Sequence, residues 1–286
     1  MLDLPVSRIR LGTGHATRLF DSGGPGDPVI LLHGLALSIE IWGKIIPKLA
    51  GRFRVIAFDF PGFGEADRPD ATYDSAFFVA QVVAVMDHLS LARSHLVGSS
   101  LGGSTVVRLS QNHQARIDRA VVMAPGGFGR ECDLSLRAPT LPWVGYALGR
   151  PTWLSNAYAL NLSMADRHFA TRELIDLAAG FARRPGSHAA FVRTVVSGLG
   201  PFGVKGTESF ARAAEGLHRP VLVLWGEQDR VFPVKQVEVA GRLLPDARVV
   251  RIDKCGHYPQ WEAPERFVAE VEAFLSPALA SVAGPG

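Results

Sequence analysis

A serine between two glycines is the feature of this sequence that most directly suggests chemistry. Residues 97–103 read VGSSLGG, which places Ser100 at the centre of a Gly-x-Ser-x-Gly pattern. An apolar run precedes the pattern and residues at helical spacing follow it. At a strand-to-helix junction this pattern is typical of a nucleophile elbow, a sharp turn that exposes a serine hydroxyl above a sheet. Gly98 and Gly102 are expected there because a Cβ at either position would collide with neighbouring backbone.

A serine hydroxyl is a poor nucleophile at neutral pH, so it needs a base, and the base needs an orienting acid. The chain has nine histidines, and His257 follows the last predicted strand in a loop fixed by glycine and proline. We therefore predict that His257 is the base. Asp229, in the acidic turn after an apolar run at 221–225, is the predicted acid. Asp253 is the weaker alternative because it lies only four residues from His257 on the same loop.

Acyl transfer also requires N–H donors for the oxyanion of the tetrahedral intermediate. The backbone N–H of Leu101, at the positive end of the helix that follows Ser100, is one predicted donor. The loop after a predicted strand at 28–32 supplies the other, which we assign to the N–H of Leu35. Gly34 allows this loop to bend toward Ser100. His33 is predicted to shape the loop through backbone hydrogen bonds rather than to take part in catalysis.

Composition excludes several classes of protein. The chain has 286 residues, 47% of them hydrophobic and 20% charged, as expected for a globular protein with one large core or a core and an inserted subdomain. The net charge of +3 and the scattered arginines predict no nucleic-acid partner. No stretch approaches the roughly 20 apolar residues of a membrane span. No export signal is recognised, and Cys132 and Cys255 have no metal or redox spacing. We expect a cytoplasmic protein without metal or cofactor that acts on a small molecule, and a homodimer is a candidate assembly.

Short apolar segments alternate with helical stretches along most of the chain. This alternation predicts a doubly wound, mostly parallel α/β sheet, with functional residues at the carboxyl ends of its strands. The strands are predicted at 15–20, 28–32, 54–59, 95–98, 120–124, 221–225 and 248–252. The helices are predicted at 41–49, 77–89, 104–112, 234–244 and 264–275.

The alternation is interrupted between residues 129 and 216, where no strand is predicted. Proline-punctuated helical pieces, at 141–148, 153–160, 172–183 and 189–197, occupy this interval instead. We predict a helical cap at 129–216 over the ends of the strands, with residues 1–128 and 217–286 forming the core. Trp143, Tyr146, Trp153, Tyr158 and Phe181 are the aromatic residues from which the cap could build an apolar roof.

Several segments, taken in order, make the chain resemble the α/β-hydrolase superfamily. They are the His33-Gly34 pair, residues 58–64 (FDFPGFG), the elbow, residues 226–229 (GEQD) and the Gly256-His257 pair. The order serine, aspartate, histidine also matches that family. The resemblance implies the α/β-hydrolase fold, with the cap inserted between strands six and seven.

Within this superfamily, residues 256–262 (GHYPQWE) and 124–129 (APGGFG) are similar to the meta-cleavage-product hydrolases, which split C–C bonds in vinylogous diketones. Three positions depart from that subfamily. Ser99 replaces an asparagine, residues 35–37 replace a glycine-rich stretch, and Tyr258 replaces a tryptophan. Arg183 and Arg184 are also displaced from the position of the subfamily's cap arginine.

We therefore expect a serine hydrolase that cleaves an ester, thioester or lactone of a fairly apolar small molecule through an acyl-enzyme. A C–C bond hydrolase of the meta-cleavage-product type is the alternative, followed by an acyltransferase or perhydrolase with the same triad. A non-catalytic ligand-binding protein is the remaining alternative, although no triad member is missing. The substrate pocket is predicted to include Gly34, Ser99, Phe128, Trp143, Tyr146 and Tyr258.

Overall fold

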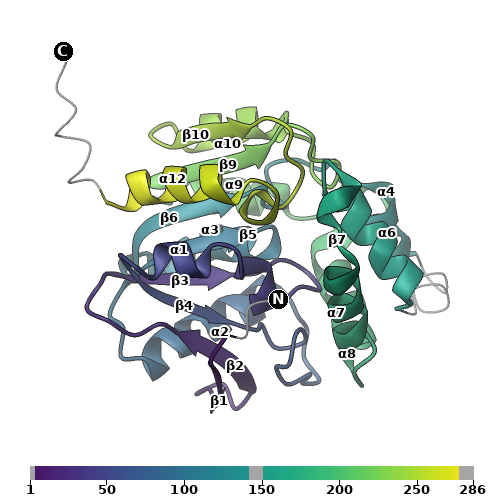
Figure 1. Ribbon diagram of the computed structural model, residues 1–286. Coiled ribbons are helices and arrows are strands. Elements are labelled where there is room, and N and C mark those ends of the chain that lie inside the picture. Colours follow the sequence, from purple (N-terminus) through teal and green to yellow (C-terminus); the bar gives the residue numbers. More distant parts are fainter. Residues whose placement is uncertain (1–3, 142–150, 277–286) are drawn as a thin grey trace.

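The fold is built on a central eight-stranded sheet, shown in Figure 1. The computed structural model describes residues 4–141 and 151–276. The strands lie in the order β1-β2-β4-β3-β5-β6-β9-β10, and all neighbours from β4 to β10 are parallel. Their bounds are β1 Val6–Arg10, β2 Ala16–Asp21, β3 Pro28–Leu32, β4 Arg54–Phe58, β5 Ser94–Ser99, β6 Ile117–Met123, β9 Val221–Gly226 and β10 Arg248–Ile252.

The mostly parallel sheet and the seven predicted strands are confirmed, and one strand was missed. β1 lies at the edge of the sheet and pairs antiparallel with β2, which itself pairs antiparallel with β4. Four of the five β1 residues are exposed. Its sequence VSRIR therefore carries no continuous apolar signal, and only the sheet edge offered by β2 makes it a strand.

Alternate residues of each inner strand face two separate apolar layers. Ile30 and Leu32 of β3 contact a cluster completed by α2 (Ser75–His88), α3 (Leu101–His113), α9 (Thr207–Glu215) and α10 (Gln236–Leu243). Val29 and Leu31 contact a second cluster completed by α1 (Ile46–Leu49) and α12 (Pro264–Leu275). Because side chains alternate along a strand and both faces are covered, the inner strands are apolar at nearly every position.

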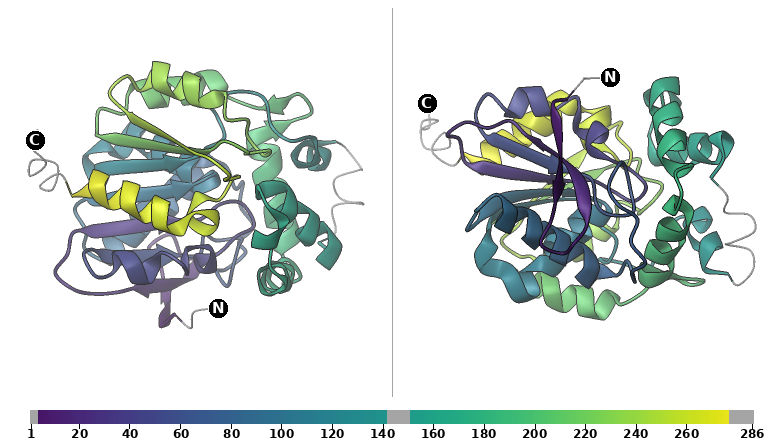
Figure 2. Two further views of the ribbon diagram at one scale, coloured as in Figure 1. Left: turned by 45° about the horizontal axis from the view of Figure 1, so that its top comes forward. Right: turned by 90° about the horizontal axis from the view of Figure 1, so that it is seen from below.

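The chain between β6 and β9 forms most of a separate helical layer. It contains α4 (Leu134–Arg137), α6 (Trp153–Ser163), α7 (Arg172–Ala182) and α8 (Ser187–Gly198), here called the cap helices. Figures 1 and 2 show these teal and green helices beside one end of the sheet. A short antiparallel pair follows, β7 (Leu199–Gly200) with β8 (Gly203–Val204), which the sequence analysis missed. Two-residue strands are too short to show periodicity.

Helix α9 closes this interval and packs against α3 and α10 on the sheet. The predicted helix at 141–148 lies mostly outside the described residues. Five further short helical elements are found in the part of the chain that the structure describes: 3-10 turns at Ile39–Trp42, Gln114–Arg116, Ala138–Thr140 and Arg167–Phe169, and α11 at Pro259–Glu262. No described helix is both long and apolar enough to cross a lipid bilayer.

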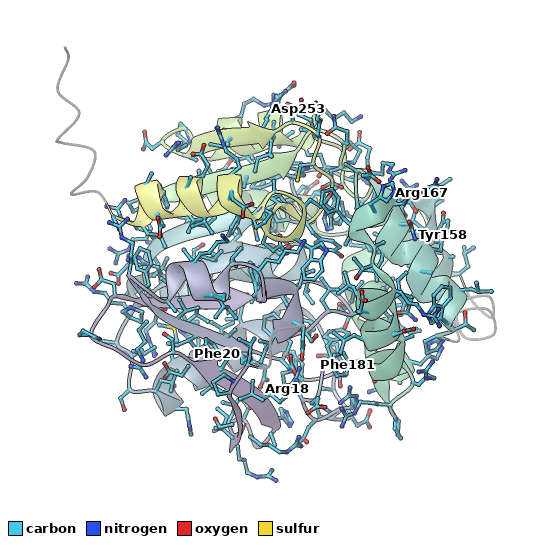
Figure 3. The ribbon with its side chains drawn as sticks, in the orientation of Figure 1. Arg18, Phe20, Tyr158, Arg167, Phe181 and Asp253 are labelled. Atoms are coloured by element: carbon cyan, nitrogen blue, oxygen red, sulfur yellow. The ribbon has the colours of Figure 1, made fainter. Side chains whose placement is uncertain are left out.

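A buried ion-pair network fixes the loops beside the first strands. Arg18 of β2 donates two hydrogen bonds to Glu40, of 2.8 and 3.0 Å, and one of 2.7 Å to Asp59. The fully buried Asp59 also accepts the backbone N–H groups of Ile39 and Glu65, at 2.9 and 2.8 Å. Arg18 further lies 5.4 Å from the ring centre of Phe181 on α7 (Figure 3). The network therefore connects the sheet, two loops and a cap helix.

We expect the variant Arg18→Met to lose about 3–5 kcal/mol of unfolding free energy, because it leaves the Asp59 carboxylate buried without its counterion. Urea denaturation followed by circular dichroism measures this loss. The matched control is Arg93→Met, which removes only the exposed Arg93–Asp118 pair and should cost less than about 1 kcal/mol. Equal losses in the two variants would contradict the role given to the network.

Candidate active site

Ser100 occupies a strained turn between β5 and α3. Its backbone has φ +53° and ψ −112°, a region that residues with a side chain rarely adopt. The Ser100 N–H donates to the carbonyl of Met123 on the neighbouring strand at 2.8 Å. A Cβ on Gly102 would lie 2.1 Å from the Leu32 carbonyl oxygen, and one on Gly98 would lie 2.4 Å from the Gly102 carbonyl. The steric requirement for both glycines is therefore present in the structure.

His257 and Asp229 form a buried hydrogen-bonded pair. His257 Nδ1 lies 2.8 Å from Asp229 Oδ2, and both side chains are almost fully buried. The second carboxylate oxygen of Asp229 accepts the N–H groups of Val231 and Phe232, at 2.8 and 3.0 Å. Because a carboxylate accepts the Nδ1–H, Nε2 of His257 is free to act as a base. Asp253 lies instead at the edge of the molecule (Figure 3) and contacts Gln228 at 3.3 Å.

Ser100 and His257 line the same cavity. It has a volume of about 600 Å³, and Leu35, Leu101 and Tyr258 also line it. No hydrogen bond joins the Ser100 hydroxyl to His257 in this structure. Hydrogen bonds between a nucleophile and its base often tighten only in the complex with substrate.

The other predicted pocket residues are placed differently. Gly34 lies behind Ser100, Ser99 is buried against Gln260, and Phe128 packs on Phe210; none of the three lines the cavity. Trp143 and Tyr146 lie outside the described residues. Among the other cap aromatics, Tyr158 and Phe181 line the cavity, whereas Trp153 does not and instead donates to Asp176.

His33 holds the loop beside Ser100 in one conformation. Its Nε2 accepts the N–H of Phe60 at 2.9 Å, so the proton is on Nδ1, which donates to the Gly34 carbonyl at 2.7 Å. Complete burial lowers the pKa of His33 and favours this neutral form. In a trans peptide the Leu35 N–H points opposite to the Gly34 carbonyl, and therefore away from His33. The predicted backbone-shaping role of His33 is confirmed.

Glu262 is a site residue that the sequence analysis did not assign. One of its carboxylate oxygens accepts the N–H groups of Ala165 and Gly256, at 2.7 and 3.0 Å, and the other accepts that of Tyr258 at 3.2 Å. Gly256 and Tyr258 are the two neighbours of His257 in the chain. Burial raises the pKa of Glu262, while the three N–H donors act in the opposite direction. This carboxylate therefore fixes the His257 loop and attaches it to the chain that follows α6.

A second contact joins the same two segments: the N–H of His257 donates to the Ser163 carbonyl at 2.6 Å. Cys255 lies two residues before His257 but is fully buried and does not line the cavity, and burial raises the pKa of its thiol. Within the described ranges no group of three His, Cys, Asp or Glu residues is arranged to hold a metal ion.

Comparison with known proteins agrees with this architecture. Residues 27–264 match the family model described as alpha/beta hydrolase fold. The chain belongs to the alpha/beta hydrolase family. This membership confirms the superfamily resemblance and identifies the protein as a hydrolase.

Two members of the family illustrate what this chain is similar to. It is 31% identical to 2-hydroxymuconate semialdehyde hydrolase of Pseudomonas sp. strain CF600 over 280 residues, 96% of each chain. A meta-cleavage product hydrolase from Pseudomonas fluorescens IP01 has a solved structure with a TM-score of 0.80. That structure is 28% identical, and the match covers 95% of this chain and 98% of the other.

We expect Glu262→Gln to lower both stability, by about 2 kcal/mol, and kcat, because an amide NH₂ would face backbone N–H groups that need an acceptor. Thermal unfolding and steady-state kinetics of an accepted substrate measure the two effects. Glu265→Gln is the matched control, since Glu265 is 77% exposed and pairs only with Lys48 at 3.2 Å. The expectation fails if the two variants behave alike.

Proposed function

We propose that the protein is a serine hydrolase of the meta-cleavage-product type, with Ser100 as nucleophile, His257 as base and Asp229 as orienting acid. The buried 2.8 Å contact between His257 and Asp229, on the wall of the cavity that Ser100 lines, is the observation that carries this proposal. Identity of 31% along nearly the whole length to a hydrolase of 2-hydroxymuconate semialdehyde supports a C–C bond as the target. Ester hydrolysis, the function that we expected from the sequence, becomes the second candidate.

The geometry suggests the order of steps. Nε2 of His257 takes the proton of the Ser100 hydroxyl as its oxygen attacks the ketone carbonyl, and Asp229 stabilises the imidazolium. The N–H groups of Leu35 and Leu101 stabilise the oxyanion. The C–C bond then breaks, its electron pair passes to the departing carbon of the conjugated fragment, and the imidazolium of His257 gives its proton to that carbon. A water molecule deprotonated by His257 finally hydrolyses the acyl-Ser100.

Ester hydrolysis remains a candidate because of residues next to the nucleophile and the base. Ser99 and Tyr258 stand where the meta-cleavage-product hydrolases tend to have asparagine and tryptophan, and residues 35–37 lack a second glycine-rich stretch. Ser99 is buried against Gln260, which donates to it at 3.3 Å, whereas Tyr258 lines the cavity. The same acyl-enzyme could be reached from an ester, a thioester or a lactone.

The assay that separates the candidates compares two substrates. We expect the enzyme to bleach the yellow dienolate of 2-hydroxymuconate semialdehyde with a higher kcat/KM than that for release of p-nitrophenol from p-nitrophenyl butyrate. Ser100→Ala should lower both values by at least about 1000-fold without unfolding the protein. A larger kcat/KM for the ester would favour the second candidate. Undiminished turnover in Ser100→Ala would falsify the nucleophile assignment.

The orienting acid is tested by a pair of isosteric variants. Asp229→Asn should reduce kcat about 10³- to 10⁴-fold, because the amide cannot stabilise the imidazolium and favours the wrong tautomer. Asp253→Asn is the matched control and should leave kcat within about twofold. The assignment is wrong if the second change costs more than the first.

A further inference from the structure

The cavity extends from Ser100 along one face of α3. Leu101, Ser104, Thr105 and Arg108 all line it, and this spacing places them on one side of the helix. At 1.5 Å per residue, Arg108 Cα lies about 12 Å from Ser100 along the helix axis.

Two cations line this end of the cavity. Arg108 donates to the Gly206 carbonyl at 3.2 Å, and its guanidinium lies 5.3 Å from the ring centre of Phe210. Lys205 donates to the Val196 carbonyl at 2.7 Å. Neither forms an ion pair with any described residue. Partial burial lowers the pKa of Arg108, and the nearby positive charge of Arg212 acts in the same direction.

The described lining residues carry one negatively charged side chain against these two cations. Among the described lining residues Asp74 is the one carboxylate, and it already caps α2 by accepting the Phe77 N–H at 2.9 Å. The cap arginines Arg183 and Arg184 do not line the cavity, and Arg184 pairs with Glu65 at 3.0 Å. A largely apolar cavity with two cations at one end suits a ligand with an anionic end.

We propose that Arg108 and Lys205 form a subsite for a substrate carboxylate that is remote from the bond cleaved at Ser100. This inference rests on the proposed function and fixes the direction of the substrate in the cavity: the carboxylate lies at the Arg108 end, and the scissile carbonyl lies between Leu35 and Leu101. A guanidinium can bind a carboxylate through two parallel hydrogen bonds, and the ammonium adds a second positive charge.

The test uses keto acids of increasing length, 4-oxopentanoate, 6-oxoheptanoate and 8-oxononanoate, each beside its uncharged methyl ester. The first readout is how well each compound protects Ser100 from labelling by a fluorophosphonate probe. The second is the Kd of each compound, measured directly by isothermal titration calorimetry. At least one acid should bind about tenfold or more tightly than its ester. Raising the salt concentration should reduce this preference.

The variants Arg108→Gln and Lys205→Met should each reduce the preference for the acid at least threefold, and the double variant should abolish it. Arg212→Gln is the matched control: it removes a nearby cation on α9 that does not line the cavity, so the preference should persist. Equal binding of acids and esters to the wild type, or a preference that survives the double variant, would overturn the subsite.

The two readouts separate this proposal from the proposed function. If the probe fails to label Ser100, the nucleophile assignment fails, while the calorimetric difference between acid and ester still decides on the subsite. If labelling succeeds without any preference for the acid, the proposed function stands and the subsite is rejected.

Discussion

The site depends on the close backbone contact between the start of α3 and the end of β3. Because there is no room for a side chain between Gly102 and the Leu32 carbonyl, only glycine fits at this position, two residues after the positive φ of Ser100. The same strand continues into the His33 loop, which brings Leu35 to the cavity. One steric contact thus links the turn at Ser100, the start of α3 and the neighbouring loop.

Buried carboxylates that bind backbone N–H groups hold the other loops. Asp59 binds two such groups beside β4, Asp229 binds two after β9, and Glu262 binds three around His257. A carboxylate that accepts several N–H groups fixes a loop more strongly than neutral hydrogen bonds would. Two of these carboxylates also bind a side chain: Arg18 for Asp59 and His257 for Asp229. Loop conformation and side-chain orientation are therefore coupled.

Features that depend on the local sequence pattern and on the order of the strands could be predicted from the sequence. The elbow, the inner strands and the choice of Asp229 over Asp253 follow from apolar runs and from the rule that sites lie at carboxyl ends of parallel strands. Glu262 could not be found this way, because its N–H donors include Ala165, which is distant in sequence. Gly34, Ser99 and Phe128 were expected to line the cavity. Whether a residue faces the cavity depends on tertiary packing, which the periodicity of the sequence does not encode.

The attachment of the helical layer has a consequence for how ligands exchange. At the His257 loop the contacts are between main-chain atoms or to a buried carboxylate, and Gly256 fits so tightly that a Cβ would lie 2.5 Å from the Ser163 carbonyl. On the opposite flank, side chains make the contacts, as in the pair of Arg184 and Glu65. We therefore expect ligand exchange to disturb the side-chain contacts between Arg184 and Glu65 before it disturbs the main-chain contacts of the His257 loop.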